Sequence, residues 1–428
     1  MSFNHFLHEN ILLPISDILS HQQVSRYLNA VELSESWPDD RMRAFQEDMF
    51  HKLVRYSADK VPFYRDWFRD QGLVPDGVSL QDLPVVSKSL MRQEGSGRFA
   101  AEDFPKKQRL TMRSSGSTGE PFTYYESKLS YSVNLAAKLR TWYQAGYRLG
   151  DCYMKIASRI RNGKWKQIQD KMNNCIFVPF YYVEEGMLKT VLDTIEKKKP
   201  CFIRSYPAPL YLLAKYRLSH PEYVFVPHCI FTTGATLYET YRETIERAFA
   251  CNVIDSYSCE GTPNVYETLV HYGYRVTDYY GIIEVLDQQN QPVTDGIGRV
   301  VSTNFWNYAQ PFLRYDTQDL VEVRSGEIVN IIGRSSDIFT CANGKVLTVH
   351  NITYYFYEEI SSIDAFQVVN HNNKSVTFRL VVNAQFNTDV ERQIVDFWQL
   401  QMGMPVDIEL VDAIPLMNNN KHLTIVNE

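Results

Sequence analysis

Residues 113–121 form a hydroxyl-rich stretch with the sequence Arg113-Ser114-Ser115-Gly116-Ser117-Thr118-Gly119-Glu120-Pro121. The flanking residues, 109–112 and 122–125, are rich in β-branched and aromatic side chains, which predicts a strand on each side of a turn. Glycines permit the positive φ angles that point successive backbone N–H groups inward, and the hydroxyl groups add further donors. The stretch therefore predicts an anion-binding loop, with a solvated hairpin turn as the alternative.

This stretch is not a Walker P-loop. That motif requires Lys-Ser or Lys-Thr after its second glycine and a helix directly behind it, whereas Glu120, Pro121 and a predicted strand follow here. A lysine that neutralises phosphate charge must therefore come from another part of the chain. The absence of Walker and kinase signatures also argues against a phosphotransferase.

The composition is that of an ordinary globular chain. It has 428 residues, of which 44% are hydrophobic and 22% charged, and this length predicts two or three domains. A net charge of -6 argues against a nucleic-acid partner. Seven cysteines without a Cys-x-x-Cys pair indicate reduced thiols and a cytoplasmic location. The sequence has no apolar run long enough to predict a transmembrane helix. Peripheral membrane association is left open.

The pattern along the chain predicts an α/β fold. Residues 1–108 show helical periodicity, and residues 150–260 alternate short strands with helices, which predicts a largely parallel sheet. Residues 274–333 are strand-rich and predict an antiparallel or barrel-like subdomain. We thus expect a large N-terminal domain, residues 1–334, with mixed, largely parallel sheets plus this β-rich subdomain. A small mobile α+β domain, residues 338–428, is expected to follow.

Two of the predicted parallel strands end in polar turns. The first reads Thr233-Gly234-Ala235, and the second reads Tyr257-Ser258-Cys259-Glu260-Gly261. Ligands of open α/β sheets bind beyond the carboxyl ends of the strands, so both turns are candidates for a binding site.

Five short elements stand in one order along the chain. They are residues 114–121, Thr-Gly-Ala at 233–235, Tyr257 with Glu260, the segment Pro311-Phe312-Leu313-Arg314-Tyr315-Asp316-Thr317-Gln318-Asp319, and Gly333-Arg334 followed by Asp337. This series resembles the adenylate-forming superfamily, specifically the phenylacetate-CoA ligase-like branch that includes CapK-type capsule-biosynthesis proteins. The segment Val61-Pro62-Phe63-Tyr64-Arg65 is similar to the N-terminal signature of that branch.

The resemblance implies a role for each element in binding ATP and Mg²⁺. The hydroxyl-rich loop would contact phosphates, the turns after the two strands would frame adenine, and a carboxylate with an arginine would hold the ribose. These residues are Ser114, Ser115, Gly116, Ser117, Thr118 and Gly119 for the phosphates, Thr233, Gly234, Ala235, Tyr257 and Ser258 for adenine, and Asp319 and Arg334 for ribose. Glu260, together with Thr118, would bind Mg²⁺, which prefers hard oxygen ligands.

The resemblance also implies a catalytic lysine, and Lys421 occupies its position near the C-terminus. The Ser-Gly usual before that lysine is replaced by Asn419-Asn420, and Asn tolerates a left-handed turn nearly as well as Gly. Asp337 would be the hinge of the small domain. Two further departures are Cys259, where Thr or Ser is usual, and Gln318, where Gly is common.

The expected function is an ATP-dependent ligase that forms an acyl-adenylate with release of pyrophosphate and then transfers the acyl group. Arg204, Tyr206, Cys259 and Gly261 are expected around the small-molecule carboxylate and give its pocket a polar character. The acceptor is expected to be an amine in capsule polysaccharide biosynthesis, with the thiol of CoA as the alternative. A non-catalytic nucleotide-binding protein is a hypothesis of a different class.

Overall fold

A computed structural model describes residues 2–113, 123–157, 164–180, 185–259, 261–269, 273–332, 338–341, 346–348, 352, 355–356, 360, 362–372, 374–414 and 425–427. Over these residues the chain is a mixed α/β protein, which confirms the predicted fold class. No helix in this part of the chain combines the length and apolar character that crossing a bilayer requires.

Helices make up most of the first hundred residues. They are α1 (Phe3–Leu7), the π-helical turn η1 (His8–Leu12), α2 (Leu13–Ser20), α3 (Val24–Ser34), α4 (Asp39–Lys60), α5 (Pro62–Gln71) and α6 (Lys88–Gln93), with the 3₁₀ turns η2 (Pro75–Gly77), η3 (Leu80–Asp82), η4 (Ser96–Phe99) and η5 (Lys106–Gln108). Pro62 occupies the start of α5, where its missing N–H costs no hydrogen bond. The all-helical expectation needs one correction, because β1 (Val86–Ser87) pairs in parallel with β13 (Tyr315–Arg324).

The flanks of the hydroxyl-rich stretch form the two predicted strands, which pair antiparallel. Its strands are β2 (Arg109–Arg113) and β3 (Thr123–Ser127). Helix α7 (Lys128–Gln144) follows directly, and the Ser127 hydroxyl caps it by accepting the N–H of Ser130 at 3.0 Å. A local side-chain bond thus marks the start of this helix directly after β3.

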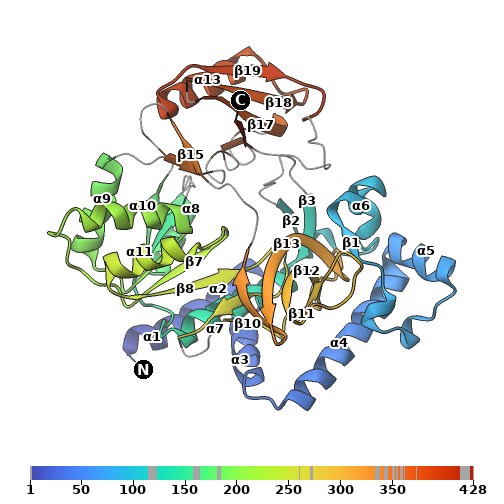
Figure 1. Cartoon of the computed structure of the whole chain (residues 1–428). Helices are drawn as coiled ribbons and strands as arrows, with labels where there is room; N and C mark the ends of the chain where they lie inside the picture. Colours follow the sequence, from blue (N-terminus) through green and yellow to red (C-terminus); the bar gives the residue numbers. More distant parts are fainter. Residues whose placement is uncertain are drawn as a thin grey trace.

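The middle of the chain builds a seven-stranded sheet in the order β10-β9-β8-β7-β6-β4-β5 (Figure 1). Its strands are β4 (Tyr153–Ala157), β5 (Cys175–Pro179), β6 (Phe202–Ser205), β7 (Cys229–Thr233), β8 (Asn252–Tyr257), β9 (Val265–Glu267) and β10 (Tyr274–Val276). The helices in this region are α8 (Lys164–Met172), α9 (Glu185–Lys198), α10 (Pro207–Leu218) and α11 (Glu239–Phe249). Strands β5, β4, β6, β7 and β8 run parallel, so their carboxyl ends meet at one edge of the sheet.

A second sheet has the order β1-β13-β12-β11, with β14 paired to β13. Its further strands are β11 (Gly281–Leu286), β12 (Gly296–Asn304) and β14 (Glu327–Ile331). All pairs except β1 with β13 are antiparallel, which confirms the antiparallel prediction for most of residues 274–333. The first of these residues are an exception, because β10 belongs to the seven-stranded sheet.

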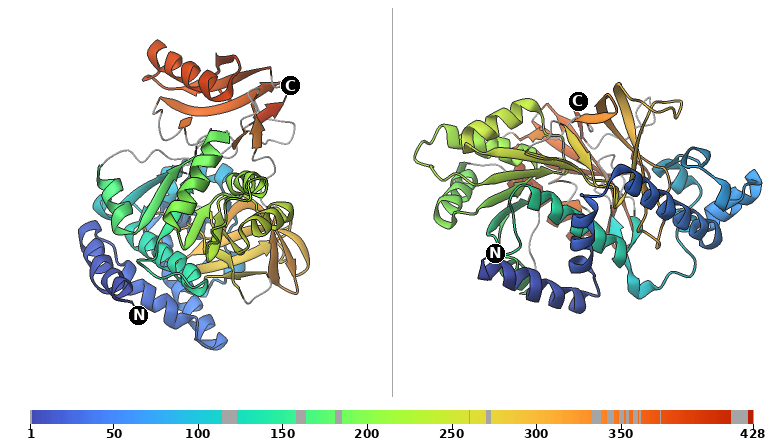
Figure 2. Two further views of the ribbon diagram at one scale, coloured as in Figure 1. Left: turned by 90° about the vertical axis from the view of Figure 1, so that its left-hand side faces the viewer. Right: turned by 90° about the horizontal axis from the view of Figure 1, so that it is seen from below.

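The C-terminal elements lie together, apart from the two larger sheets, and are drawn in orange to red in Figures 1 and 2. They are β15 (Ile338–Thr340), β16 (Val346–Thr348), β17 (Ile363–His371), β18 (Ser375–Val382), α13 (Thr388–Met402), β19 (Val406–Leu410) and β20 (Ile425–Asn427). Strands β17 to β20 form one sheet in the order β19-β18-β17-β20. A core of their own, which includes Phe356, Phe378 and Trp398, packs between them. The boundary at Asp337 and the mobility of this part stay predictions.

The largest core joins the N-terminal helices to both sheets. It contains Phe50 of α4, Phe231 of β7 and Tyr315 of β13, all of them buried. Helices α9, α10 and α11 pack on the seven-stranded sheet through a second core that includes Val191 and Ile245. These shared cores fix the carboxyl ends of β6, β7 and β8 relative to β13.

Candidate active site

Half of the predicted site lies outside the described residues. These residues are Ser114, Ser115, Gly116, Ser117, Thr118, Gly119, Glu260, Arg334, Asp337 and Lys421. The phosphate loop, the metal ligand, the hinge and the catalytic lysine therefore stay predictions from the sequence. The remaining candidates are described, and they come from the ends of three neighbouring parallel strands and from β13.

Tyr257 and Asp319, which are 62 positions apart in sequence, are in direct contact. Tyr257 ends β8, and its hydroxyl donates to Asp319 Oδ2 at 2.9 Å and lies 3.2 Å from Thr317 Oγ1. The pKa of Tyr257 is well above its ordinary value, first because the ring is buried and then because Asp319 is negatively charged. The seven-stranded sheet and the second sheet thus meet at Tyr257 and Asp319. The sequence assigns both residues to the binding of one nucleoside.

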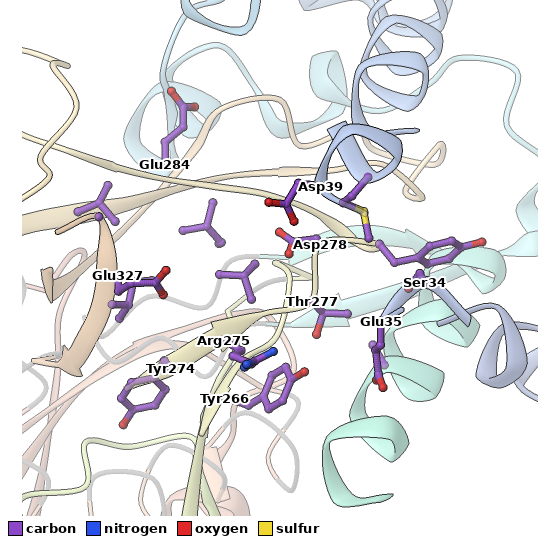
Figure 3. Close-up of a pocket in the computed structure, with 18 of the residues that line it drawn as sticks. Ser34, Glu35, Asp39, Tyr266, Tyr274, Arg275, Thr277, Asp278, Glu284 and Glu327 are labelled. Atoms are coloured by element: carbon purple, nitrogen blue, oxygen red, sulfur yellow. The ribbon is translucent and has the colours of Figure 1, made fainter. Parts of the chain in front are cut away.

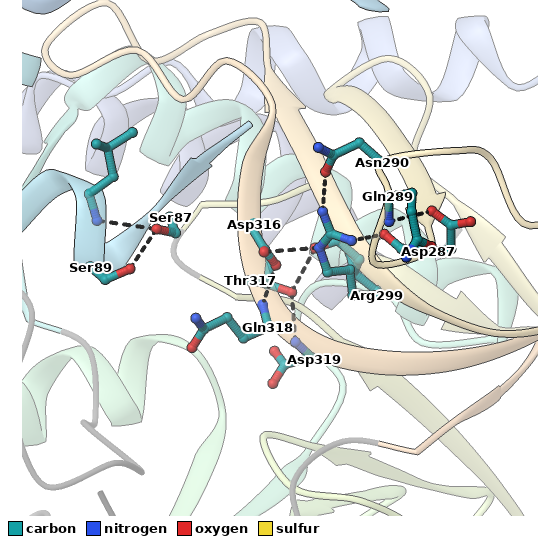
Figure 4. A network of polar contacts seen from close by, with 12 residues as sticks. Ser87, Ser89, Asp287, Gln289, Asn290, Arg299, Asp316, Thr317, Gln318 and Asp319 are labelled. Atoms are coloured by element: carbon teal, nitrogen blue, oxygen red, sulfur yellow. Dashed lines mark hydrogen bonds and ion pairs between the residues drawn. The ribbon is translucent and has the colours of Figure 1, made fainter. Parts of the chain in front are cut away.

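A network of polar contacts holds this part of β13 (Figure 4). Asp316 accepts the backbone N–H of Gln318 at 2.8 Å and the Nε–H of Arg299 at 3.0 Å. The backbone N–H of Asp319 donates to Thr317 Oγ1, whose hydroxyl in turn bonds the backbone of β12. Gln318 has a left-handed φ of 62°. These hydrogen bonds within residues 316–319 therefore fix the backbone that leads to Asp319.

The turn after β7 lies beside the same elements. Gly234 has a φ of 78°, and a Cβ atom at this position would lie 2.8 Å from Cε1 of Tyr206. Thr236 Oγ1 donates to the carbonyl of Ile332 at 3.1 Å, and the N–H of Ile332 donates to the carbonyl of Leu320. Ile332 is the last described residue before Gly333-Arg334. The fold thus gathers segments next to four of the five sequence elements.

The segment after β8 forms a closed turn. Cys259 N–H donates to Thr262 Oγ1 at 2.8 Å, and Thr262 N–H donates to the carbonyl of Cys259 at 2.6 Å. The carbonyl of Gly261 accepts from the Asn304 amide at 2.6 Å. These bonds fix the backbone on both sides of residue 260.

A cavity of about 580 Å³ opens at the carboxyl ends of β4, β6 and β7. Arg204, Tyr206 and Thr233 line it, whereas the other described candidates, Cys259 and Gly261 among them, do not. The four residues that the sequence groups around the substrate are therefore divided between this cavity and the turn after β8.

Sequence reasoning missed Lys138, which lines the same cavity from α7. Its neighbours on this face of the helix are Tyr131, Leu135, Leu139 and Trp142, so the periodicity reads as ordinary core packing. The pKa of Lys138 is lowered to about 8, chiefly by burial and further by the charge of Arg204. A lysine within an otherwise apolar and aromatic stripe was the available signal.

Another cavity, of about 780 Å³, is lined by none of the described candidates (Figure 3). Tyr266, Tyr274, Thr277 and Asp278 face it from β9, β10 and the residues that follow β10. Burial raises the pKa of Asp278 to about 6. Neither this cavity nor any other part of the described chain gathers three or more His, Cys, Asp or Glu side chains in a metal-binding cluster.

Two known proteins illustrate what this chain is similar to in sequence. CapK of Staphylococcus aureus is 22% identical over 407 residues, which cover 89% of this chain and 88% of CapK. A phenylacetate-coenzyme A ligase of Thermus thermophilus is 26% identical over 334 residues, 71% of this chain and 73% of the ligase. No family model matches the chain.

Solved structures show the same fold. A 2-hydroxyisobutyryl-CoA ligase in complex with 2-HIB-AMP and CoA superposes with a TM-score of 0.58 at 20% identity, covering 92% of this chain and 91% of the ligase. The same ligase in its postadenylation state, with R3-HIB-AMP, gives a TM-score of 0.57 at 19% identity, with 91% of this chain and 90% of the ligase covered. The chain thus shares the fold of this ligase. In sequence it resembles CapK and the phenylacetate-CoA ligases, as the five sequence elements predict.

Proposed function

We propose that this protein activates a small-molecule carboxylate with ATP, releases pyrophosphate, and transfers the acyl group to an amine in capsule or exopolysaccharide biosynthesis. The contact between Tyr257 and Asp319, next to the cavity lined by Thr233, carries this proposal. It gives one end of the site a fixed acceptor for a nucleoside and the other end room for an acyl group.

The described residues fit the nucleoside end of ATP. Asp319 presents a carboxylate with two acceptor oxygens, which suits a pair of ribose hydroxyls, and Tyr257 and Thr317 restrict its orientation. Gly234 brings backbone close to Tyr206, so a flat ring can pass this turn without meeting a side chain on it. We assign the adenine contacts to Thr233, Gly234, Ala235, Tyr257 and Ser258. The phosphate contacts are assigned to residues 114–119 and a further ribose contact to Arg334.

Mg²⁺ enters the proposal from the resemblance alone. Its proposed ligands, Glu260 and Thr118, lie outside the described residues, although the bonds of Cys259 and Gly261 hold the backbone beside Glu260. When bound, the metal would neutralise triphosphate charge.

Replacing Glu260 by Gln should abolish Mg²⁺-supported turnover and leave the unfolding temperature unchanged. A variant that melts at a lower temperature but keeps full specific activity would assign Glu260 a structural role.

Two versions of this function differ in the group that accepts the acyl chain. The amine follows from the CapK-type resemblance of the sequence elements, and the likeness to CapK covers more of the chain than the likeness to the phenylacetate-CoA ligases. The phenylacetate-CoA ligases support the thiol of CoA equally well in chemical terms. Mixing preformed acyl-adenylate with CoA or with amino sugars and amino acids distinguishes them, because only the true acceptor accelerates release of AMP.

Carboxylate-dependent exchange of labelled pyrophosphate into ATP tests the activation step. We expect exchange with at least one carboxylate and AMP as the nucleotide product. ATP binding without exchange by any carboxylate would identify a non-catalytic nucleotide-binding protein. ADP as the product would identify a phosphotransferase.

A further inference from the structure

The cavity at the carboxyl ends of β4, β6 and β7 contains two cationic side chains. Lys138 enters from α7 and Arg204 from β6. In the described part of the chain no ion pair joins either side chain to a carboxylate, and the carboxylate whose charge acts on Lys138 is Glu126, a buried residue of β3 outside the cavity lining. Two neighbouring cations with this single carboxylate leave net positive charge at the cavity, which favours an anion that binds between them.

The remaining charged groups of the cavity do not supply this counter-charge. Asp17 is buried, and its two oxygens accept the N–H groups of Val24 and Ser25 and the Ser25 hydroxyl. Lys155 of β4 adds a third positive charge. His8 bonds the carbonyl groups of Asn4 and Met172.

The Arg204 guanidinium lies 5.7 Å from the ring centre of Trp142, so one of its faces is covered by an aromatic ring. The edge of the guanidinium can still donate a forked pair of hydrogen bonds, and a planar carboxylate accepts such a pair.

We propose that the acyl substrate carries a second carboxylate, which Lys138 and Arg204 bind while the first carboxylate is activated. This assignment rests on the proposed function and narrows its substrate class to dicarboxylates. The aromatic side chains Tyr131, Trp142 and Tyr206 line the cavity between its polar groups and would contact the carbon chain or ring that separates the two carboxylates.

The proposal predicts a pH dependence. Lys138 has a pKa of about 8, lowered by burial and by Arg204 and partly restored by the charge of Glu126. A bound carboxylate favours the charged amine and raises this pKa. Affinity for the dicarboxylate should therefore be full below about pH 8 and should fall as the pH rises through that value. A monocarboxylate should not show this fall.

The experiment compares diacids with monoacids of the same carbon number in the pyrophosphate-exchange assay: glutarate with valerate, and isophthalate with 3-methylbenzoate. The wild-type protein should favour the diacid of one pair by about ten- to hundredfold in kcat/KM, as expected for a charge-assisted hydrogen bond. Lys138→Met should remove most of this preference through KM, and Lys138→Arg should retain part of it. Leu139→Met, on the same helix and in the same cavity, is the matched control and should keep the preference.

A calorimetric titration with glutarate gives a readout that does not depend on turnover. Glutarate should bind the wild-type protein with ATP present and Mg²⁺ removed by EDTA, a condition that prevents turnover, and Lys138→Met should weaken this binding by at least tenfold. Equal use of mono- and dicarboxylates, unchanged by Lys138→Met, would overturn the dicarboxylate assignment while leaving the proposed function intact. Displacement of glutarate by ATP would also overturn it, because the cations would then belong to the nucleotide. Absence of exchange with every acid would instead count against the proposed function, and the titration would still decide whether the cavity binds a diacid.

Discussion

At the scale of single residues, the candidate site depends on close contacts that leave little freedom. The Tyr257 hydroxyl holds one oxygen of Asp319 at 2.9 Å, and Gly234 leaves no space for a Cβ atom beside the Tyr206 ring. A single substitution removes each contact, and a second variant serves as the control for each substitution.

Replacing Asp319 by Ala should weaken ATP binding by about ten- to hundredfold and change the rate constant for adenylation much less. The ribose contact is the same in the ground and transition states, and a charge-assisted hydrogen bond is worth about 1.5–3 kcal/mol. ATP affinity and single-turnover rates measure the two effects separately. Tyr257→Phe is the control, because it removes the partner of Asp319 and keeps the carboxylate. Equal losses in both variants would make Asp319 a positioning residue for Tyr257 rather than a ribose ligand.

Replacing Gly234 by Ala should destabilise the protein by about 1–2 kcal/mol through its left-handed backbone, and should also displace the Tyr206 ring towards the cavity. Carboxylate KM should therefore rise in this variant. Gly72→Ala carries the same type of strain, since Gly72 has a φ of 64° with open space around its Cβ position, and should lower stability without changing KM. If both variants leave KM unchanged, Tyr206 does not shape the substrate site.

At the scale of elements, β13 connects the two sheets to the candidate site. It pairs with β1 and β12 in the second sheet, and its Thr317 and Asp319 contact the end of β8 in the first. The left-handed residue Gln318 lies between these two contacts, at a position where the resemblance leads us to expect Gly. Gln318 therefore has the left-handed backbone conformation that glycine adopts without strain.

Gln318→Val should therefore lower the free energy of unfolding by about 1–2 kcal/mol and weaken ATP binding, because a β-branched residue opposes a left-handed backbone. Gln318→Gly should retain ATP affinity, since relief of strain offsets the roughly 0.5–1 kcal/mol entropic cost of glycine. Denaturant unfolding and ATP titration measure the two effects. Ser325→Val tests the same strain at a φ of 50° in the exposed turn between β13 and β14, and should not change ATP affinity. A Gln318→Val variant with normal ATP affinity would show that Asp319 is positioned independently of this turn.

At the scale of the whole molecule, the C-terminal elements have a core of their own, and the described part of the candidate site lies in the larger sheets. This separation is what a lid requires. We propose that residues 338–428 turn about Asp337 and deliver Lys421 to the α-phosphate only when the lid closes.

Lys421→Ala should accordingly bind ATP almost normally, lose pyrophosphate exchange by orders of magnitude, and still transfer the acyl group from chemically prepared acyl-adenylate. The reason is that a lysine delivered on closure stabilises charge that exists only in the transition state of adenylation. Exchange at the wild-type rate would remove Lys421 from the mechanism and make Lys345 the next candidate to test.

The fold class and the strands that flank the hydroxyl-rich stretch could be predicted from the residues alone. These features depend on local periodicity and turn residues, which neighbouring residues encode directly. The order of five short motifs also predicted the likeness that the comparisons found. The pairing of β1 with β13 and the contact of Tyr257 with Asp319 could not be predicted in this way, because both join residues that are distant in the chain and meet only after folding.

The cavity and its cations show the same division. The sequence suggested Arg204 and Tyr206 for the substrate, but Lys138 was hidden in a helical stripe that reads as core packing. Periodicity shows which face of a helix is buried and does not identify the residues that pack against that face. Only the packing of α7 against the ends of β4, β6 and β7 shows that Lys138 faces a cavity together with Arg204, because these residues are distant in the sequence and meet only in the folded chain.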